Sequence, residues 1–179
     1  MAEILQELLE TEDVRKAEAE AMLAGIVLDT KSFSLRTGER TFDAASWLRR
    51  CGADTSEIKK LFQIDMDTAL GRYKLMQNAK LYRGVAITVS DEPQERIVAA
   101  QAADELLNIS GVEASVVGST DGKNGVYASA RSIGTMNVQI LMEKLGGGGN
   151  RSAAAVVFEH TTPAQAEEKI RAAIDDYLG

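Results

Sequence analysis

Apolar side chains recur at helical spacing through the first 80 residues. Ile4 and Leu8, for example, would lie on the same face of a helix over residues 2–10. Comparable patterns predict further helices over residues 13–25, 43–51, 56–63 and about 67–79. Gly25 is expected to end the second helix, because glycine commonly follows the last helical turn. The apolar run at residues 26–28 fits either a buried strand or a helix end.

After residue 80 the pattern changes to short β-branched runs that alternate with helices. Strands are predicted over residues 85–89, 114–117, 126–130 and 153–158. Helices are predicted over residues 95–108, 137–144 and 163–178. The sequence therefore predicts an α/β protein, in which a mainly helical first part is followed by a mixed β-sheet flanked by helices. The simplest domain boundary lies near residue 80.

Composition narrows the classes of function. The 179 residues are 45% hydrophobic and 26% charged, which is typical of a soluble globular protein. The net charge of -7 disfavours long nucleic acid as a partner, although it leaves room for a local phosphate pocket. The one cysteine excludes an internal disulfide, and the one histidine disfavours catalysis based on several imidazoles. No run of 18 apolar residues is present, so we expect neither a membrane segment nor a signal peptide.

The strongest local feature is the run of four glycines at 146–149, which is followed by Asn150, Arg151 and Ser152. Glycine lets consecutive backbone N–H groups turn toward an anion, so the run fits a phosphate-binding nest. A flexible linker has the same composition and is the alternative. The run lacks the following Lys-Ser/Thr of a P-loop.

Three further places offer polar chemistry near the ends of predicted strands and helices. Arg131, at the end of a predicted strand, could bind a phosphate through two N–H groups with Ser132 beside it, or could be a solvated arginine at the sheet edge. Asn137 could cap the following helix or reach a ligand. Asp29 follows a buried apolar segment and could ligate a metal or form a turn.

Several runs taken together are far more specific than any of them alone. They are LDTKSF (28–33), RTFDAA (40–45), AQAAD (100–104), SGVEAS (110–115), SARS (129–132), NVQ (137–139) and MEKLGGGG (142–149). In this order they resemble the DHH phosphoesterase family, and within it the GdpP-type cyclic-di-AMP phosphodiesterases. The resemblance covers essentially the whole chain, from a helix late in the DHH domain through the C-terminal DHH-associated domain.

This resemblance implies a fold and an activity. In the family, two α/β lobes face each other across a cleft, and the DHH lobe holds a pair of manganese ions. The associated lobe binds the substrate through a Gly-Gly-Gly-His motif, and the reaction opens cyclic-di-AMP to linear pApA. Residues 1–80 would then be a remnant of the DHH domain and residues 81–179 the DHH-associated domain. The parent is anchored in the membrane, with this part facing the cytoplasm.

Individual positions carry over as follows. Asp29 matches a late manganese-ligating aspartate of the DHH lobe. The matches to substrate-binding positions are Arg131, Ser132 and Asn137, the glycines Gly147, Gly148 and Gly149, and Asn150 in the place of the family's histidine.

Two departures from the family pattern change the expectation for this chain. The early His-x-Asp segment, the next aspartate and the Asp-His-His motif are absent, and one aspartate cannot hold a metal pair. We therefore expect the isolated chain to bind no manganese and to be inactive. Asn150 can donate and accept hydrogen bonds, but it cannot carry the positive charge of a histidine.

Three functional hypotheses remain at the level of sequence. The first is the substrate-binding portion of a manganese-dependent cyclic-di-AMP phosphodiesterase. The second is a non-catalytic module that binds nucleotides or short RNA. The third is a fragment of an oligoribonuclease or of a 3′-phosphoadenosine phosphate phosphatase. The expected partner is a cyclic dinucleotide or short oligonucleotide, and a homodimer is left open because the first 80 residues would expose apolar surface.

Overall fold

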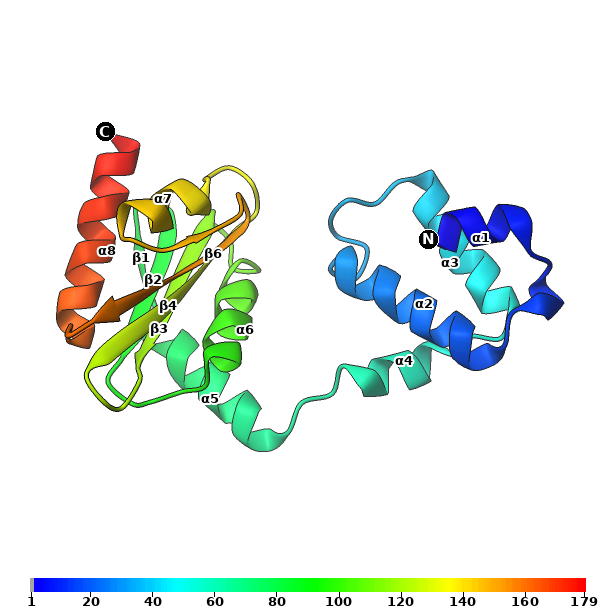
Figure 1. The fold of residues 1–179 in the computed structure, drawn as a ribbon, viewed down its shortest axis with the longest axis horizontal. Helices are drawn as coiled ribbons and strands as arrows, with labels where there is room; N and C mark the ends of the chain where they lie inside the picture. Colours follow the sequence, from blue (N-terminus) through cyan, green and yellow to red (C-terminus); the bar gives the residue numbers. More distant parts are fainter. Residues whose placement is uncertain (1) are drawn as a thin grey trace. The chain divides into compact units, whose positions relative to one another are not determined.

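The computed structural model describes residues 2–179, which divide between Ile64 and Asp65 into two compact units (Figure 1). The division lies earlier than the boundary expected near residue 80. The reason is that the helix over Met66–Gln77 packs with the second unit, where Leu75 is buried among side chains of the following helix and sheet. None of the helices formed by the described residues combines the length and hydrophobicity that crossing a bilayer requires.

The first unit is helical, as predicted. Its elements are α1 (Ala2–Leu8), the short 3₁₀ turn η1 (Thr11–Asp13), α2 (Lys16–Asp29), α3 (Glu39–Arg50) and α4 (Thr55–Leu61). Its core joins Leu23 of α2, Trp47 and Leu48 of α3, and Ile58 of α4. Asp54 caps α4 by accepting a hydrogen bond from the Ser56 backbone N–H at 2.8 Å.

One expectation for this unit is wrong. Gly25 does not end α2, which continues to Asp29, so residues 26–28 are helical and form no strand. A glycine inside a helix costs about 1 kcal/mol relative to alanine, and packing of neighbours such as Leu23 and Ile26 into the core offsets that cost. Thr30 follows the last helical residue as its C-cap, and its Oγ1 donates to the Ile26 carbonyl at 2.7 Å.

The second unit is built on a mixed sheet. Its elements are α5 (Met66–Gln77), β1 (Lys80–Tyr82), β2 (Val85–Ser90), α6 (Arg96–Leu106), β3 (Ala114–Thr120), β4 (Gly125–Ser132), α7 (Val138–Lys144), β5 (Gly148–Gly149), β6 (Ala153–Glu159) and α8 (Pro163–Leu178). The described residues form six strands in the order β1-β2-β3-β4-β6-β5. The pairing of β2 with β3 is parallel and the other pairings are antiparallel, so the predicted α/β class with a mixed sheet is confirmed.

Helices cover both faces of this sheet (Figure 1). On one face α7 and α8 bury Leu141, Ile170 and Ile174 against the strands. On the other face α5 and α6 bury Leu75 and Leu106. Because both faces are covered, β3 and β4 are buried along almost their whole length, and only the strand ends and the loops that follow them can reach a ligand.

The strands β1 and β5 were not expected. β1 has three residues that are mostly exposed, and β5 consists of two glycines, so neither has the apolar alternation by which a strand is recognised.

Candidate functional site

Three segments that carry predicted substrate residues meet at one end of the sheet. Arg131 and Ser132 end β4, Asn137 stands before α7, and Gly148–Gly149 form β5. Two backbone hydrogen bonds join these segments: Ser132 N–H donates to the Ser152 carbonyl at 3.0 Å, and Val138 N–H donates to the Arg151 carbonyl at 3.1 Å. We call the group formed by Arg131, Ser132, Asn137 and residues 147–152 the hairpin site.

Arg131 is held by the protein and is not a solvated arginine. Its side chain is only 19% exposed. Its Nε donates to Asp104 Oδ2 on α6 at 3.2 Å, and its Nη1 donates to the Ala130 carbonyl at 2.9 Å. These bonds fix the plane of the guanidinium. The carboxylate of Asp104 also balances its charge.

Ser132 and Asn137 both stabilise the chain between β4 and α7. Ser132 is buried, and its Oγ accepts from Gly134 N–H at 3.0 Å. Asn137 caps α7, because its Oδ1 accepts from Gln139 N–H at 3.1 Å. The capping interpretation is therefore confirmed. The side-chain nitrogen of Asn137 makes no hydrogen bond within residues 2–179 and remains a donor for a ligand.

The glycines form an ordered strand, not a flexible linker. A Cβ at Gly147 would lie 2.2 Å from the Ala155 carbonyl oxygen, and a Cβ at Gly149 would lie 2.4 Å from that of Ala153. Only glycine lets the backbone lie this close to β6. The Gly147 N–H donates to the Met142 carbonyl at 2.8 Å, so an anion at that amide would compete with this bond. A Cβ at Gly148 would meet no atom within 4 Å.

Asn150 closes the turn between β5 and β6. Its Oδ1 accepts from Ser152 N–H at 3.0 Å, from Ser152 Oγ at 3.2 Å and from Ala153 N–H at 2.9 Å. Its own N–H donates to the Ala153 carbonyl at 2.7 Å. The side-chain oxygen therefore has a structural task, which is the turn-forming bond that asparagine makes in many loops.

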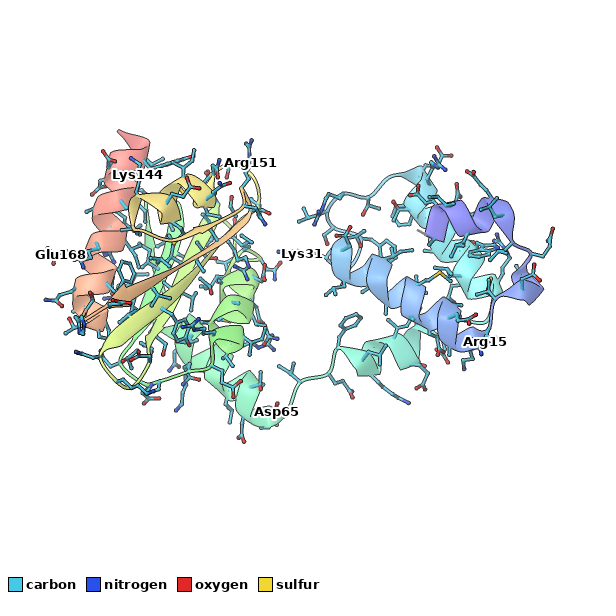
Figure 2. All side chains as sticks on the ribbon, viewed as in Figure 1. Arg15, Lys31, Asp65, Lys144, Arg151 and Glu168 are labelled. Carbon is cyan, nitrogen blue, oxygen red and sulfur yellow. The ribbon has the colours of Figure 1, made fainter. Side chains whose placement is uncertain are left out.

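Arg151 belongs to the glycine-rich run, but the sequence interpretation assigned it no role in binding. It lies at the end of the sheet where the β5–β6 hairpin turns, and its side chain is labelled in Figure 2. The side chain is exposed, and its Nη2 donates to the Gly134 carbonyl at 3.1 Å. Its position directly after a turn-forming asparagine and beside a glycine run was the available signal.

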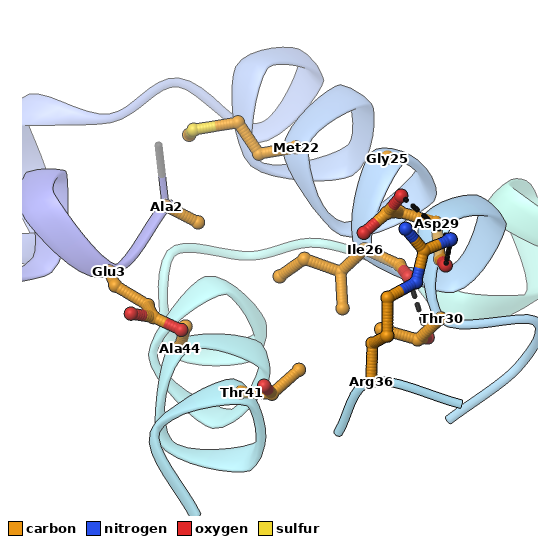
Figure 3. Close-up of a pocket in the computed structure, with 10 residues that line it drawn as sticks. All are labelled: Ala2, Glu3, Met22, Gly25, Ile26, Asp29, Thr30, Arg36, Thr41 and Ala44. Carbon is orange, nitrogen blue, oxygen red and sulfur yellow. Dashed lines mark hydrogen bonds and ion pairs between the residues drawn. The ribbon is translucent and has the colours of Figure 1, made fainter. Parts of the chain in front are cut away.

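Asp29 lies in the first unit, beside a pocket of about 470 Å³ (Figure 3). It is the last residue of α2, and its side chain is 71% exposed. Arg36 lies close: its Nη2 is 3.5 Å from Asp29 Oδ1 and donates to the Asp29 carbonyl at 3.2 Å. The other carboxylate that lines this pocket is that of Glu3.

This donor set does not fit a metal pair. Hard divalent cations take several oxygen or imidazole ligands, and within residues 2–179 no group of three or more His, Cys, Asp or Glu side chains is close enough to hold an ion. Asp29 offers one carboxylate, and Arg36 already neutralises part of its charge. The described residues alone therefore do not compose the manganese centre that the resemblance implies.

Comparisons with known proteins relate this chain to a domain family and to curated sequences. The DHHA1 domain matches residues 82–179. The chain is 46% identical over 183 residues to the cyclic-di-AMP phosphodiesterase PdeA of Listeria monocytogenes, covering 98% of this chain and 28% of that protein. It is 48% identical over 184 residues to the cyclic-di-AMP phosphodiesterase GdpP of Geobacillus thermodenitrificans, covering 99% of this chain and 28% of that protein.

A solved structure supports the fold across both units. An exopolyphosphatase-related protein from Bacteroides fragilis superimposes with a TM-score of 0.85 at 20% identity, covering 97% of this chain and 54% of that one. At this identity the likeness concerns the fold alone. The chain spans just over a quarter of the length of the curated relatives that it matches.

Proposed function

The chain belongs to the DHHA1 domain family, and on that premise we propose that it is the substrate-binding portion of a cyclic-di-AMP phosphodiesterase, the enzyme that converts cyclic-di-AMP to pApA. The names of three curated relatives support this proposal, because each of the three is called a cyclic-di-AMP phosphodiesterase and is 46–48% identical over nearly all of this chain. We assign the activity to a longer, membrane-anchored protein whose present part faces the cytoplasm.

The observation that carries the proposal is the assembly of the hairpin site. Residues between 131 and 150 that the resemblance assigns to substrate are brought to one end of the sheet and joined by hydrogen bonds between their segments. A cyclic dinucleotide presents two phosphodiester groups, each with a single negative charge. Such groups are well matched by a fixed guanidinium and by backbone or amide N–H donors.

Three residues of the site have a definite part in this proposal. Arg131 presents the outer edge of its guanidinium to a phosphate, and Asp104 keeps that edge in one orientation. The side-chain nitrogen of Asn137 donates to the nucleotide while its oxygen holds α7. The open side of Gly148 lets the ligand approach the hairpin backbone closely.

The manganese dependence of the longer protein is part of the same proposal. Asp29 would contribute one carboxylate to the metal pair, and the remaining ligands would come from other residues of the parent. Two metal ions supply a nucleophilic water and neutralise charge on the phosphate. We therefore expect that this chain alone binds the dinucleotide without hydrolysing it.

Isothermal titration calorimetry of cyclic-di-AMP and pApA into the purified chain tests the proposal. We expect saturable binding that Arg131→Ala weakens at least tenfold, because a charge-assisted hydrogen-bond pair is lost. Arg83→Ala is the matched control, since Arg83 is also paired with a carboxylate but lies in the turn after β1, at the opposite edge of the sheet. Absence of binding, or equal loss in both variants, would contradict the proposal.

A further inference from the structure

The cationic and polar groups of the hairpin site differ in how far the protein already uses them. The guanidinium of Arg131 is paired with Asp104, so its charge is balanced. Asn150 is neutral, and its side-chain oxygen is occupied by three hydrogen bonds of the turn. A dinucleotide with two negative charges would therefore find little uncompensated positive charge at these two residues.

Arg151 is different in this respect. No carboxylate within residues 2–179 lies within 4.0 Å of its guanidinium, and its hydrogen bond to the Gly134 carbonyl uses only one of five N–H donors. The uncompensated positive charge of the hairpin site is thus on Arg151. Its planar fork of donors has the geometry that a phosphate accepts in bidentate fashion.

Hydrogen bonds also restrict the position of the Arg151 backbone and guanidinium. The Arg151 carbonyl accepts from Val138 N–H, and the preceding residue closes the turn with its side chain, so the backbone on both sides is fixed. The bond from Nη2 to Gly134 holds the guanidinium against the loop that follows Ser132. In the pairing of β4 with β6, Arg131 lies opposite Ala153, two residues beyond Arg151. Both arginines therefore lie at the same end of the sheet.

From these observations we infer that Arg151 is a second phosphate-binding residue of the hairpin site and provides most of its electrostatic attraction for a dinucleotide. This inference rests on the proposed function for the identity of the ligand. Arg131, held by Asp104, would orient one phosphate, while Arg151 would attract and bind the other. The contribution of Arg151 should also be the more sensitive to salt, because its side chain is the more exposed.

Calorimetry with matched variants tests this inference. We expect Arg151→Ala to weaken binding of cyclic-di-AMP and pApA about tenfold and to make the remaining affinity less dependent on salt. Arg151→Lys should retain part of the affinity, since it keeps the charge but loses the fork. Lys123→Ala removes the same charge from the β3–β4 turn at the other end of β4 and should leave binding unchanged. Unaltered affinity of Arg151→Ala would overturn the inference.

A second readout separates this inference from the proposed function. In the ¹⁵N-labelled chain, the Nε–H resonance of Arg151 should shift saturably when inorganic pyrophosphate is added, and Arg151→Lys identifies that resonance. If neither dinucleotide binds but pyrophosphate shifts Arg151, the proposed function fails and the phosphate-binding role of Arg151 stands. If pyrophosphate leaves the resonance unmoved and no dinucleotide binds, both are overturned.

Discussion

At the scale of single residues, the side chain of Asn150 shows how one position can shape a candidate site by holding the turn beside it. Its oxygen receives three hydrogen bonds that hold the β5–β6 turn, and this turn places Arg151 and the ordered glycines. An imidazole at this position could accept at most one of those bonds, since a neutral histidine has a single acceptor nitrogen. Asparagine at position 150 therefore has a structural role, which is to accept the hydrogen bonds of the turn, and this role does not depend on charge.

The turn role of Asn150 predicts a local loss of stability on mutation. Asn150→Ala removes the shared acceptor and should cost about 1–2 kcal/mol, because the donors of Ser152 and Ala153 then depend on water. Amide hydrogen exchange should show faster exchange at residues 152 and 153. Asn150→Asp retains an acceptor oxygen and serves as the control. Equal protection in all three proteins would show that the side chain does not hold the turn.

The sequence predicted the role of a residue where that role depends only on its neighbours in the chain. Roles that depend on contacts between distant residues could not be predicted. Asn137 was correctly seen as a cap, because capping needs only the helix that follows. The pairing of Arg131 with Asp104 was not foreseen, since the two residues are 27 positions apart in sequence. Arg151 was missed because its exposure and its unbalanced charge become visible only once the hairpin is formed.

At the scale of elements, the regular patterns were reliable and the exceptions have physical causes. The strands β2, β3 and β4 form where the short β-branched runs predicted them, and the helix α8 follows its apolar periodicity. The helix α2 continues through a glycine because tertiary packing outweighs the intrinsic cost. The strand β5 has no side chains, so its pairing with β6 cannot be recognised from hydrophobicity.

The glycines of the hairpin allow a sharp comparison of neighbouring positions. Gly147→Ala places a Cβ 2.2 Å from the Ala155 carbonyl oxygen, so the strand β5 must move away from β6. We expect a loss of about 1–3 kcal/mol, typical of overpacking, together with a lower affinity for the dinucleotide. Gly148→Ala meets open space and should leave the stability within about 0.5 kcal/mol.

Chemical denaturation and calorimetry of these two variants would measure both effects. The comparison is informative because the substitutions are identical and the positions are adjacent. If Gly147→Ala were as stable as Gly148→Ala, the close approach of β5 to β6 would not be required. The glycine run would then have to be explained by the ligand alone.

The attachment of the edge strand β1 to α8 should depend on pH. Arg83 and Tyr82 donate hydrogen bonds to Asp175 and hold the pKa of its carboxyl below its usual value. A lowered pKa in the folded state means that the carboxylate stabilises the fold above its ordinary pKa. This contribution is lost as the pH falls through the lower folded value.

Hydrogen exchange at residues 80–82, measured from neutral pH downward, would detect this loss as weaker protection in acid, once the intrinsic exchange rate is corrected for pH. Asp175→Asn should make the protection of β1 nearly independent of pH in this range. Asp91→Asn is a suitable control, because Asp91 is exposed and makes no side-chain hydrogen bond or ion pair with the described residues. The same pH dependence in all three proteins would exclude Asp175 as its source.

At the scale of the whole molecule, the sequence pattern correctly located the change from helices to strands. The boundary between the two compact units lies elsewhere. The predicted boundary near residue 80 marks where the strands begin. The compact units divide at Ile64, because α5 packs on α6 and shares its core. An amphipathic pattern shows that a helix has a buried face, but it does not show which neighbour covers that face.

This difference can be tested with two fragments. Residues 65–179 should fold independently, because they keep both covered faces of the sheet. A fragment of residues 81–179 lacks α5 and would expose the side chains of α6 that Leu75 covers, including Val98 and Ala102. We expect urea denaturation to give this fragment a lower free energy of unfolding than residues 65–179. A single buried Leu→Ala change costs about 2–5 kcal/mol, and the difference between the fragments should be larger than that.

The full-length variant Leu75→Ala would separate packing from chain length, since it keeps α5 but removes the largest fully buried side chain that α5 contributes to this core. A loss of about 2–5 kcal/mol would assign that part of the difference between the fragments to the packing of Leu75 and the rest to the other residues of α5. The shorter fragment should also bind cyclic-di-AMP less tightly, because α6 carries Asp104, which holds Arg131. If residues 81–179 were as stable as residues 65–179 and bound equally well, the boundary of the binding unit would lie near residue 80 after all. The helix α5 would then be an accessory to the fold.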